Sequence, residues 1–251
     1  MAEQAELTAD KVLGGRVSLF QPAEGYRAAI DPVLLAASVP EMPKSGAGCV
    51  VDLGCGVGTA GLCLLARLPG VSCFGIDVQP ALVDLANRNA AASGLADRYR
   101  AIAGNILDDA CLRAAGPADQ VIVNPPYLPR GQASVSDHPV KALANVESDT
   151  VLADWVAAAI AIAVPRGHVT FIHRADRLPE LLSLMQDRLG DLAILPILPK
   201  PLTPARRVLV RGQRGNRAPA RLLAPFVLHE TDGRFTQQAE AVLRDGGPIL
   251  L

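Results

Sequence analysis

The sequence has few of the features that mark several common protein classes. Only 20% of its 251 residues are charged and the formal net charge is −1, so the chain is neither a disordered polyelectrolyte nor a globally basic nucleic-acid binder. Its five cysteines include no Cys-x-x-Cys pair and its four histidines lack ligand spacing, which argues against a disulfide framework and a metal site. No apolar run reaches about 18 residues and the N-terminus is polar, so neither a transmembrane helix nor a signal peptide is expected. These absences favour a reduced, cytoplasmic protein.

From residue 49 onward, short apolar runs alternate with Ala/Leu-rich stretches, which is typical of a parallel sheet with helical crossovers. The expected strands are 49–53, 71–77, 100–104, 119–123, 167–173, 193–198 and 207–212, and the expected helices are 59–68, 80–93, 150–163 and 176–189. The segment LPKPLTPAR between the last two strands is too short for a helical crossover, so those strands should pair antiparallel. The fold class is therefore an α/β, Rossmann-like, seven-stranded and mostly parallel sheet with an antiparallel final strand pair.

The length of 251 residues suits one large domain with short extensions. Residues 1–48 precede the sheet pattern and hold a strand-like RVSLFQP and a short apolar helix in DPVLLAASVP. We predict that they form an N-terminal extension, a hairpin and a short helix, on a main domain at 49–251. The end of the chain adds one more apolar run, APFVLHE, and a helix near 235–244.

A glycine-rich turn follows the first strand of this pattern. In VVDLGCGVG, glycines 54, 56 and 58 stand between a strand and a helix, where bare backbone can approach a ligand. The spacing is GxGxG, not the GxGxxG of dinucleotide folds, and Asp52 lies two residues before the first glycine. Because a carboxylate would repel a pyrophosphate and attract a sulfonium or an ammonium group, the turn favours S-adenosylmethionine (SAM) as cofactor over NAD.

Polar residues after the next two strands complete the predicted cofactor site. Asp77 ends the second strand about 20 residues beyond the glycines, where an acid can accept hydrogen bonds from both ribose hydroxyls. Asn105 and Ile106 follow the third strand and could frame the adenine with an amide and an apolar wall. A role of Asn105 or Asp108 as a helix cap is an equally good interpretation.

The tetrapeptide Asn124-Pro125-Pro126-Tyr127 follows the fourth strand. A planar nitrogen is a weak nucleophile because its lone pair is delocalised, and two carbonyl acceptors can orient it towards a methyl donor. The Asn124 side-chain oxygen and the Pro125 carbonyl could accept its two N–H groups. Two prolines would hold the backbone rigid, and Tyr127 would stack on the planar acceptor. The motif predicts an N-methyltransferase site.

With these motifs in place, the chain resembles the bacterial tRNA1(Val) adenine-37-N6 methyltransferase family, which has the class I methyltransferase fold. The resemblance rests on LGGRVSLFQPAEGYRAAIDPVLLAA, VDLGCGVG, GIDVQP, NPPY, ALANVE and LHETDGRFTQQAE. It implies a SAM-dependent methyltransferase domain at 49–251, cofactor contacts by Asp52, Gly54, Gly56 and Asp77, and acceptor contacts by Asn124 to Tyr127. It also places Asp31 near the cofactor, although Asp31 could equally be a helix N-cap.

The choice of substrate depends on the resemblance and on local charge. Between residues 199 and 221 there is no acid, and the seven basic residues are Lys200, Arg206, Arg207, Arg211, Arg214, Arg217 and Arg221. Of these we assign Lys200, Arg206, Arg207 and Arg211 to RNA phosphates; the alternative is a solvated surface. The favoured function is N6-methylation of an adenine in RNA, with tRNA as the favoured substrate. The alternatives are a protein-glutamine N5-methyltransferase and a catalytically silent SAM-binding protein that interacts with RNA.

Overall fold

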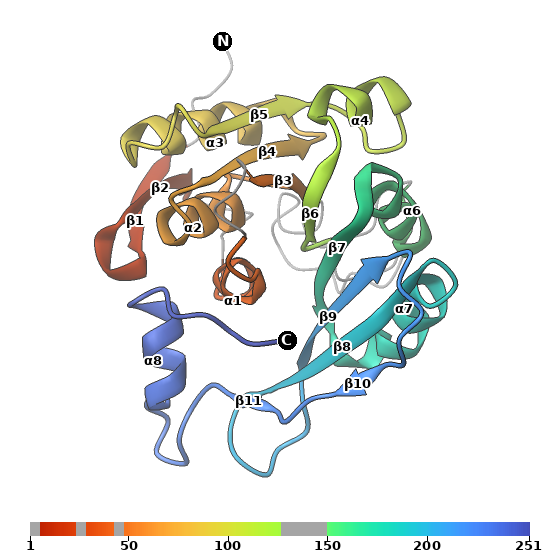
Figure 1. The fold of residues 1–251 in the computed structure, drawn as a ribbon. Coiled ribbons are helices and arrows are strands. Elements are labelled where there is room, and N and C mark those ends of the chain that lie inside the picture. Colours follow the sequence, from red (N-terminus) through yellow and green to blue (C-terminus); the bar gives the residue numbers. More distant parts are fainter. Residues whose placement is uncertain (1–5, 24–28, 43–47, 127–149) are drawn as a thin grey trace, which may run out of the picture.

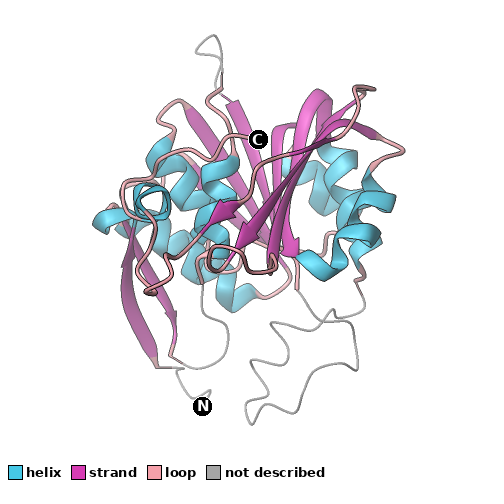
Figure 2. Cartoon of the chain, turned by 90° about the horizontal axis from the view of Figure 1, so that it is seen from below, coloured by secondary structure: helices cyan, strands magenta, loops and turns pink. Residues whose placement is uncertain are grey.

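A central sheet with helices on both faces organises the chain in the computed structural model, which describes residues 6–23, 29–42, 48–126 and 150–251 (Figures 1 and 2). The spatial order is β10-β8-β9-β7-β6-β3-β4-β5, and β9 runs antiparallel to β7 and β8. All seven predicted strands are present: β3 (Gly48–Leu53), β4 (Val71–Asp77), β5 (Tyr99–Ala103), β6 (Ala118–Val123), β7 (Ala163–Arg174), β8 (Leu189–Leu198) and β9 (Arg207–Arg214). The predicted fold class and its antiparallel final pair are confirmed.

Some boundaries differ from the prediction. Two short strands, β10 (Arg221–Leu222) and β11 (Phe226–Val227), pair parallel with β8. Strands of two residues are too short to show the alternation of apolar and polar residues that marks a strand. At β11 the sequence showed only the apolar run APFVLHE, and at β10 it showed no signal. The predicted helix 176–189 is a 3₁₀ turn, η2 (Ala175–Arg177), followed by α7 (Leu178–Met185). The prediction was wrong beyond Met185 because Leu189 already pairs with Arg214 of β9.

The helices divide between the two faces of the sheet (Figure 2). On one face α1 (Asp31–Ser38), α2 (Thr59–Arg67), α3 (Pro80–Ala92) and α8 (Gln237–Leu243) share a hydrophobic cluster. On the other face α4 (Asp109–Ala115), α6 (Leu152–Ile162) and α7 share a second one. Among the described helices none is long and apolar enough to cross a membrane. The two clusters cover both faces of the sheet, and the loops lie at the ends of the strands.

Residues 6–22 form an antiparallel hairpin of β1 (Leu7–Val12) and β2 (Val17–Pro22), joined by η1 (Leu13–Gly15). The hairpin is held to α3 by Asn89, whose side chain is fully buried. The Asn89 Oδ1 accepts the Phe20 N–H at 2.7 Å, and its amide nitrogen donates to the Phe20 carbonyl at 3.1 Å and to the Val57 carbonyl at 3.0 Å. Asn89 thereby connects the N-terminal hairpin to the glycine turn.

Candidate functional site

The residues predicted for cofactor and acceptor follow neighbouring strands at one edge of the sheet. In the parallel register, Leu53 of β3 pairs with Ile76 of β4 and with Val123 of β6. Gly54 and Asn124 are therefore the residues directly after a pair of neighbouring positions, Leu53 and Val123. Neighbouring strands lie about 4.8 Å apart. Because all these strands are parallel, their carboxyl ends meet, and the structure brings the two predicted halves of the site together (Figure 1).

The glycine turn requires glycine for two reasons. Gly54, Gly56 and Gly58 have φ values of 72°, 54° and 85°, which are unfavourable for residues with a side chain. Space is also short, since a Cβ on Gly54 would lie 2.8 Å from the Trp155 ring and one on Gly58 would lie 2.9 Å from the Tyr99 hydroxyl. The Gly54 N–H donates to the Ile76 carbonyl at 2.8 Å. The turn is thus fixed against β4, with its backbone close to the carboxyl edge.

Two buried carboxylates flank this turn. Asp52 is 2% exposed and accepts the Gly61 N–H at 3.2 Å. Burial raises the pKa of Asp52 to about 7; the nearby Asp77 carboxylate adds to this rise, and the Gly61 hydrogen bond opposes it. Asp77 accepts the Gly56 and Gln79 N–H groups, both at 2.9 Å. Burial also raises the pKa of Asp77, and these two hydrogen bonds lower it in part.

The charge of these carboxylates fits a cationic ligand. Within the described part of the chain, the ion pairs involve neither Asp52 nor Asp77. Thr59, the first residue of α2 after the glycine turn, has a buried hydroxyl without a hydrogen-bond partner. The site thus combines the negative potential of the two carboxylates, the bare backbone of the glycine turn and the unpaired Thr59 hydroxyl. This combination fits the sulfonium and ammonium groups of SAM.

Asn105 and Ile106 lie after β5, beside Asp77, whose carbonyl accepts the Gly104 N–H at 2.9 Å. Asp108 is the N-cap of α4 and accepts the Ala110 N–H at 2.8 Å, while Asn105 Oδ1 accepts the Leu107 N–H at 2.9 Å in a local turn. The Ile106 side chain is buried in the core against α4 and α6. The large apolar side chains that are exposed here are Leu107, at 52%, and Val78 after Asp77, at 63%. The sequence analysis assigned no role to Leu107 or Val78. The available signal was that each is an apolar residue next to an acid, Leu107 beside Asp108 and Val78 beside Asp77.

The acceptor motif is described up to Pro126. Asn124 and Pro126 are half-buried and Pro125 is buried, directly after β6. Tyr127 lies outside the described residues, as do Tyr26, Arg27 and the ALANVE segment at 142–147. Next to this turn, β7 brings His173, which is fully buried and whose Nδ1 accepts the Arg174 N–H at 2.7 Å. Burial lowers the pKa of His173 to about 4, so the imidazole is neutral at pH 7.

Asp31 and Arg207, which the sequence assigned to different ligands, contact each other. Arg207 Nε lies 2.8 Å from Asp31 Oδ2, across 176 positions of sequence. Asp31 is the first residue of α1 and Ile30 is its N-cap, so the alternative of Asp31 as N-cap is wrong. The ion pair joins α1 to the carboxyl-edge end of β9, two strands from Asn124.

The seven basic residues between 199 and 221 do not lie on one surface. Strand β9, which carries several of them, runs from the carboxyl edge of the parallel strands to the opposite edge, where those strands begin. Lys200 and Arg206 are exposed at the carboxyl edge, where Lys200 Nζ donates to the Thr231 carbonyl at 3.3 Å. Arg211, in the middle of β9, is half-buried and donates to the carbonyls of Ser38 and Leu251. Arg214 and Arg217 lie towards the opposite edge, and Arg221 lies on β10, level with Arg211.

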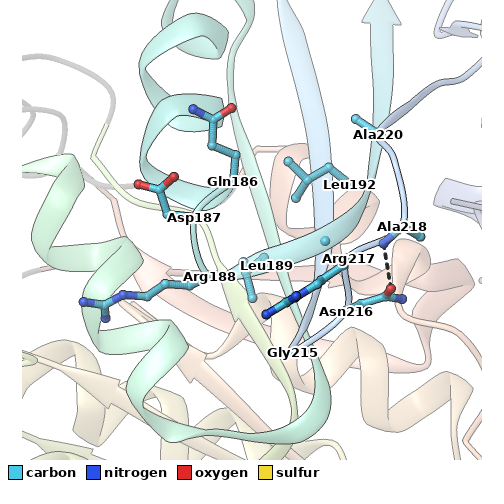
Figure 3. Close-up of a pocket in the computed structure, with 11 residues that line it drawn as sticks. Gln186, Asp187, Arg188, Leu189, Leu192, Gly215, Asn216, Arg217, Ala218 and Ala220 are labelled. Carbon is cyan, nitrogen blue, oxygen red and sulfur yellow. Dashed lines mark hydrogen bonds between the residues drawn. The ribbon is translucent and has the colours of Figure 1, made fainter.

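A hollow of about 590 Å³ lies at this opposite edge, lined by the end of α7 and by the loop after β9 (Figure 3). Arg188 and Arg217 are among its lining residues, and the Asn216 side chain accepts the Ala218 N–H at 2.9 Å (Figure 3). The glycine turn, Asp77 and Asn124 are all at the carboxyl edge, so the hollow is not the predicted cofactor site.

Trp155 of α6 is the main residue near the site whose position sequence reasoning did not foresee. Trp155 is 9% exposed and lies within the hydrophobic cluster of α6. Its ring, however, also packs against Gly54, and its indole N–H is buried without a hydrogen-bond partner. The contact spans about a hundred residues of sequence, and the only signal for it was that Trp155 is the single tryptophan of the chain.

Comparison with known proteins gives consistent matches. The model of the methyltransferase small domain family matches residues 33–149. A tRNA1(Val) (adenine(37)-N6)-methyltransferase of Porphyromonas gingivalis is 30% identical over 193 residues, 72% of this chain and 74% of that protein. A release factor glutamine methyltransferase of Rhodospirillum rubrum is 44% identical over 82 residues, 33% of this chain and 24% of that protein. The crystal structure of a predicted O-methyltransferase from Agrobacterium tumefaciens aligns with a TM-score of 0.71 and 25% identity, over 88% of this chain and 99% of that one.

Proposed function

Because the chain belongs to the SAM-dependent methyltransferase family that includes the tRNA1(Val) (adenine(37)-N6)-methyltransferases, we propose that it methylates N6 of an adenine in RNA, with tRNA as substrate. The observation that supports this most is the adjacency of two motifs. The glycine turn after Leu53 and the Asn124-Pro125-Pro126 turn after Val123 follow paired positions of neighbouring strands. A methyl donor held by the first would lie beside an amine held by the second.

SAM is the cofactor, and when bound it supplies an electrophilic methyl group on a sulfonium. We assign the cofactor contacts to Asp52, Gly54, Gly56, Asp77, Asn105 and Ile106. Asp77 retains acceptor capacity for the ribose hydroxyls, since each of its oxygens accepts only one backbone N–H. Asp52 and Asp77 together provide the negative potential, and Asn105 keeps its amide N–H groups for the adenine. The exposed Val78 and Leu107 extend the apolar wall that we assigned to Ile106.

In the acceptor half, the Asn124 side-chain oxygen and the Pro125 carbonyl each accept one N–H of the substrate amine. This arrangement would turn the nitrogen lone pair out of conjugation. As the nitrogen–carbon bond forms, the bond between the methyl group and sulfur would break and leave a neutral thioether, and the proton lost by the nitrogen would pass to solvent. Pro125 and Pro126 have restricted φ angles and no backbone N–H, so they cannot compete for these carbonyls. We assign the stacking of the base to Tyr127.

The proposal of RNA as substrate is supported by Lys200 and Arg206, which are exposed at the same edge as the acceptor turn. Arg207 lies there too, although it is paired with Asp31. Arg211 lies farther from that edge and donates to protein carbonyls, so its assignment to phosphate has the least support. We also propose that residues 1–48 act as an extension of the main domain at 49–251, since Leu19 and Leu34 share a hydrophobic cluster with Leu62.

A protein-glutamine N5-methyltransferase is the second candidate. It is favoured by the 44% identity to the Rhodospirillum rubrum enzyme, although that match covers only 24% of the enzyme. The two candidates can be separated by incubating the protein with tritiated SAM, bulk RNA and a protein extract, both from cells that lack the gene. N6-methyladenosine in the digested RNA is the expected product, whereas label confined to N5-methylglutamine in protein would contradict the proposal.

A further inference from the structure

The loop between β8 and β9 exposes an apolar side chain at its tip. Leu202 is 101% exposed, more than any other large hydrophobic residue in the described part of the chain. Its φ is 57°, a left-handed conformation that costs a leucine energy and that glycine or asparagine normally takes in turns. Leu13 also has a positive φ, of 51°, but it is 2% exposed and contributes to the core. For Leu202 no packing within the described chain accounts for the choice of residue.

The tip is held firmly by hydrogen bonds. The Thr203 hydroxyl donates to the Lys200 carbonyl at 2.6 Å and accepts the Lys200 N–H at 3.2 Å. The base of the loop is joined to the segment before α8, since the His229 N–H donates to the Pro199 carbonyl at 3.1 Å. The His229 ring stacks on Phe235 with centroids 4.7 Å apart, and Phe235 is 37% exposed. Leu202 is therefore presented to solvent by a fixed turn.

By strand direction the loop lies at the same edge as the acceptor turn. The loop itself is seen at the lower end of Figure 1. Strands β6, β7, β9 and β8 are consecutive neighbours, so β8 is three strand spacings, about 15 Å, from Asn124. That distance corresponds to four or five stacked nucleotides at about 3.4 Å each. The exposed cations Lys200 and Arg206 flank Leu202 in the sequence of this loop. A nucleic acid offers partners for both kinds of group, since its bases can pack against an apolar side chain and its phosphates can pair with the cations.

We propose that Leu202 is a wedge that packs against bases of the RNA substrate, a few nucleotides from the methylated adenine, while Lys200 and Arg206 hold the adjacent phosphates. This inference depends on the proposed RNA substrate. Apolar side chains inserted at base steps unstack them and stabilise a distorted nucleic acid. The wedge would thus favour the tRNA conformation in which the target adenine is out of its stack.

The test measures binding separately from methylation, with an in vitro transcribed tRNA and the full-length protein. Leu202→Gly removes the side chain and relieves the left-handed backbone, so the Tm should not fall. We expect the Kd for tRNA to rise roughly five- to tenfold, and Leu202→Met to restore most of it. The slope of log Kd against log salt should be unchanged, because the lost contact is apolar, whereas Arg206→Gln should reduce that slope.

Leu222→Ala is the matched control, since Leu222 is 74% exposed on β10 and carries no predicted role. Its Kd for tRNA should equal that of the wild type. An unchanged Kd for Leu202→Gly, or a wild type that does not bind tRNA, would overturn the wedge. A wild type that binds tRNA through Leu202 but transfers no methyl group to RNA would support the wedge and contradict the proposed function.

Discussion

The two edges of the sheet have similar residue types and different surroundings. Both edges have glycines with positive φ, an asparagine in a loop and exposed arginines. At the carboxyl edge the glycines are packed against Trp155 and Tyr99, and the acids Asp52 and Asp77 are buried. At the opposite edge Gly215 has open space around it, and Asp191 is paired with Arg221 at 2.9 Å. The hollow in Figure 3 is at the opposite edge, and the arrangement that fits a cofactor is at the carboxyl edge, so a hollow alone does not locate this site.

The strongest test of this comparison exchanges one asparagine at each edge for alanine. Asn124→Ala should lower kcat by about a thousandfold, because it removes an acceptor that orients the amine, while the Kd for SAM stays within a few fold. Asn216→Ala, in the loop at the opposite edge, should leave kcat unchanged. Single-turnover kinetics and calorimetry of SAM binding measure the two quantities. An equal loss of SAM binding and turnover in Asn124→Ala would contradict the division between cofactor and acceptor halves.

The second test compares two glycines with the same φ of 72°, Gly54 and Gly215. Gly54→Ala adds a Cβ 2.8 Å from the Trp155 ring, and nothing lies within 4 Å of a Cβ on Gly215. Both variants pay about 1–2 kcal/mol for the left-handed backbone, and only Gly54→Ala adds roughly 1–3 kcal/mol of overpacking and loses SAM affinity. Urea unfolding at constant m-value measures the difference. If the two variants are equally stable, the contact with Trp155 is not a tight one.

The third test neutralises two cations at each edge. Lys200→Gln with Arg206→Gln should weaken tRNA binding about tenfold and reduce the salt slope by about 1.5. Arg188→Gln with Arg217→Gln, beside the hollow, should change neither quantity. The reverse outcome would move the RNA path to the opposite edge and would contradict our assignment of Lys200 and Arg206.

The smallest expected effect is a pH dependence of SAM affinity. Asp52 has a pKa of about 7 in the free protein, so it is largely protonated at pH 6 and ionised at pH 8. A bound cation favours the ionised form, so binding below pH 7 releases a proton and the Kd should fall by up to about tenfold between pH 6 and 8. Calorimetry in buffers of different ionisation enthalpy detects this proton. Asp52→Asn should abolish the dependence; its persistence would assign the titration to another group.

The same raised pKa has the opposite effect on stability. Asp52 is protonated in the native state up to about pH 7 and in the unfolded state only to about pH 4, so its contribution is present at low pH and is lost as the pH rises through this window. His173 has the reverse sign, because its native pKa of about 4 lies below the unfolded value near 6.5. Its contribution is present above pH 6.5 and is lost as the pH falls towards 4.

Much of the fold was predictable because its signals are local. Each strand from β3 to β9 is a short apolar run, and Pro80 and Gly94 bracket α3 through restricted φ and a left-handed residue. The short linker before Arg207 required an antiparallel pair. The pairing of β10 and β11 with β8 could not be predicted, because two-residue strands show no periodic pattern of apolar residues. The end of α7 could not be predicted either, because Leu189 pairs with β9 instead of extending the helix.

By itself the sequence determined the order of the elements and the chemistry at the strand ends, because a glycine turn and a proline turn are properties of a few consecutive residues. Only the tertiary structure decided which distant residues meet. It set Trp155 against Gly54 and paired Asp31 with Arg207. It also divided one basic stretch of sequence between two edges, because an extended strand of eight residues spans the whole sheet. Contacts of this kind depend on the packing of the complete chain, and no local pattern encodes them.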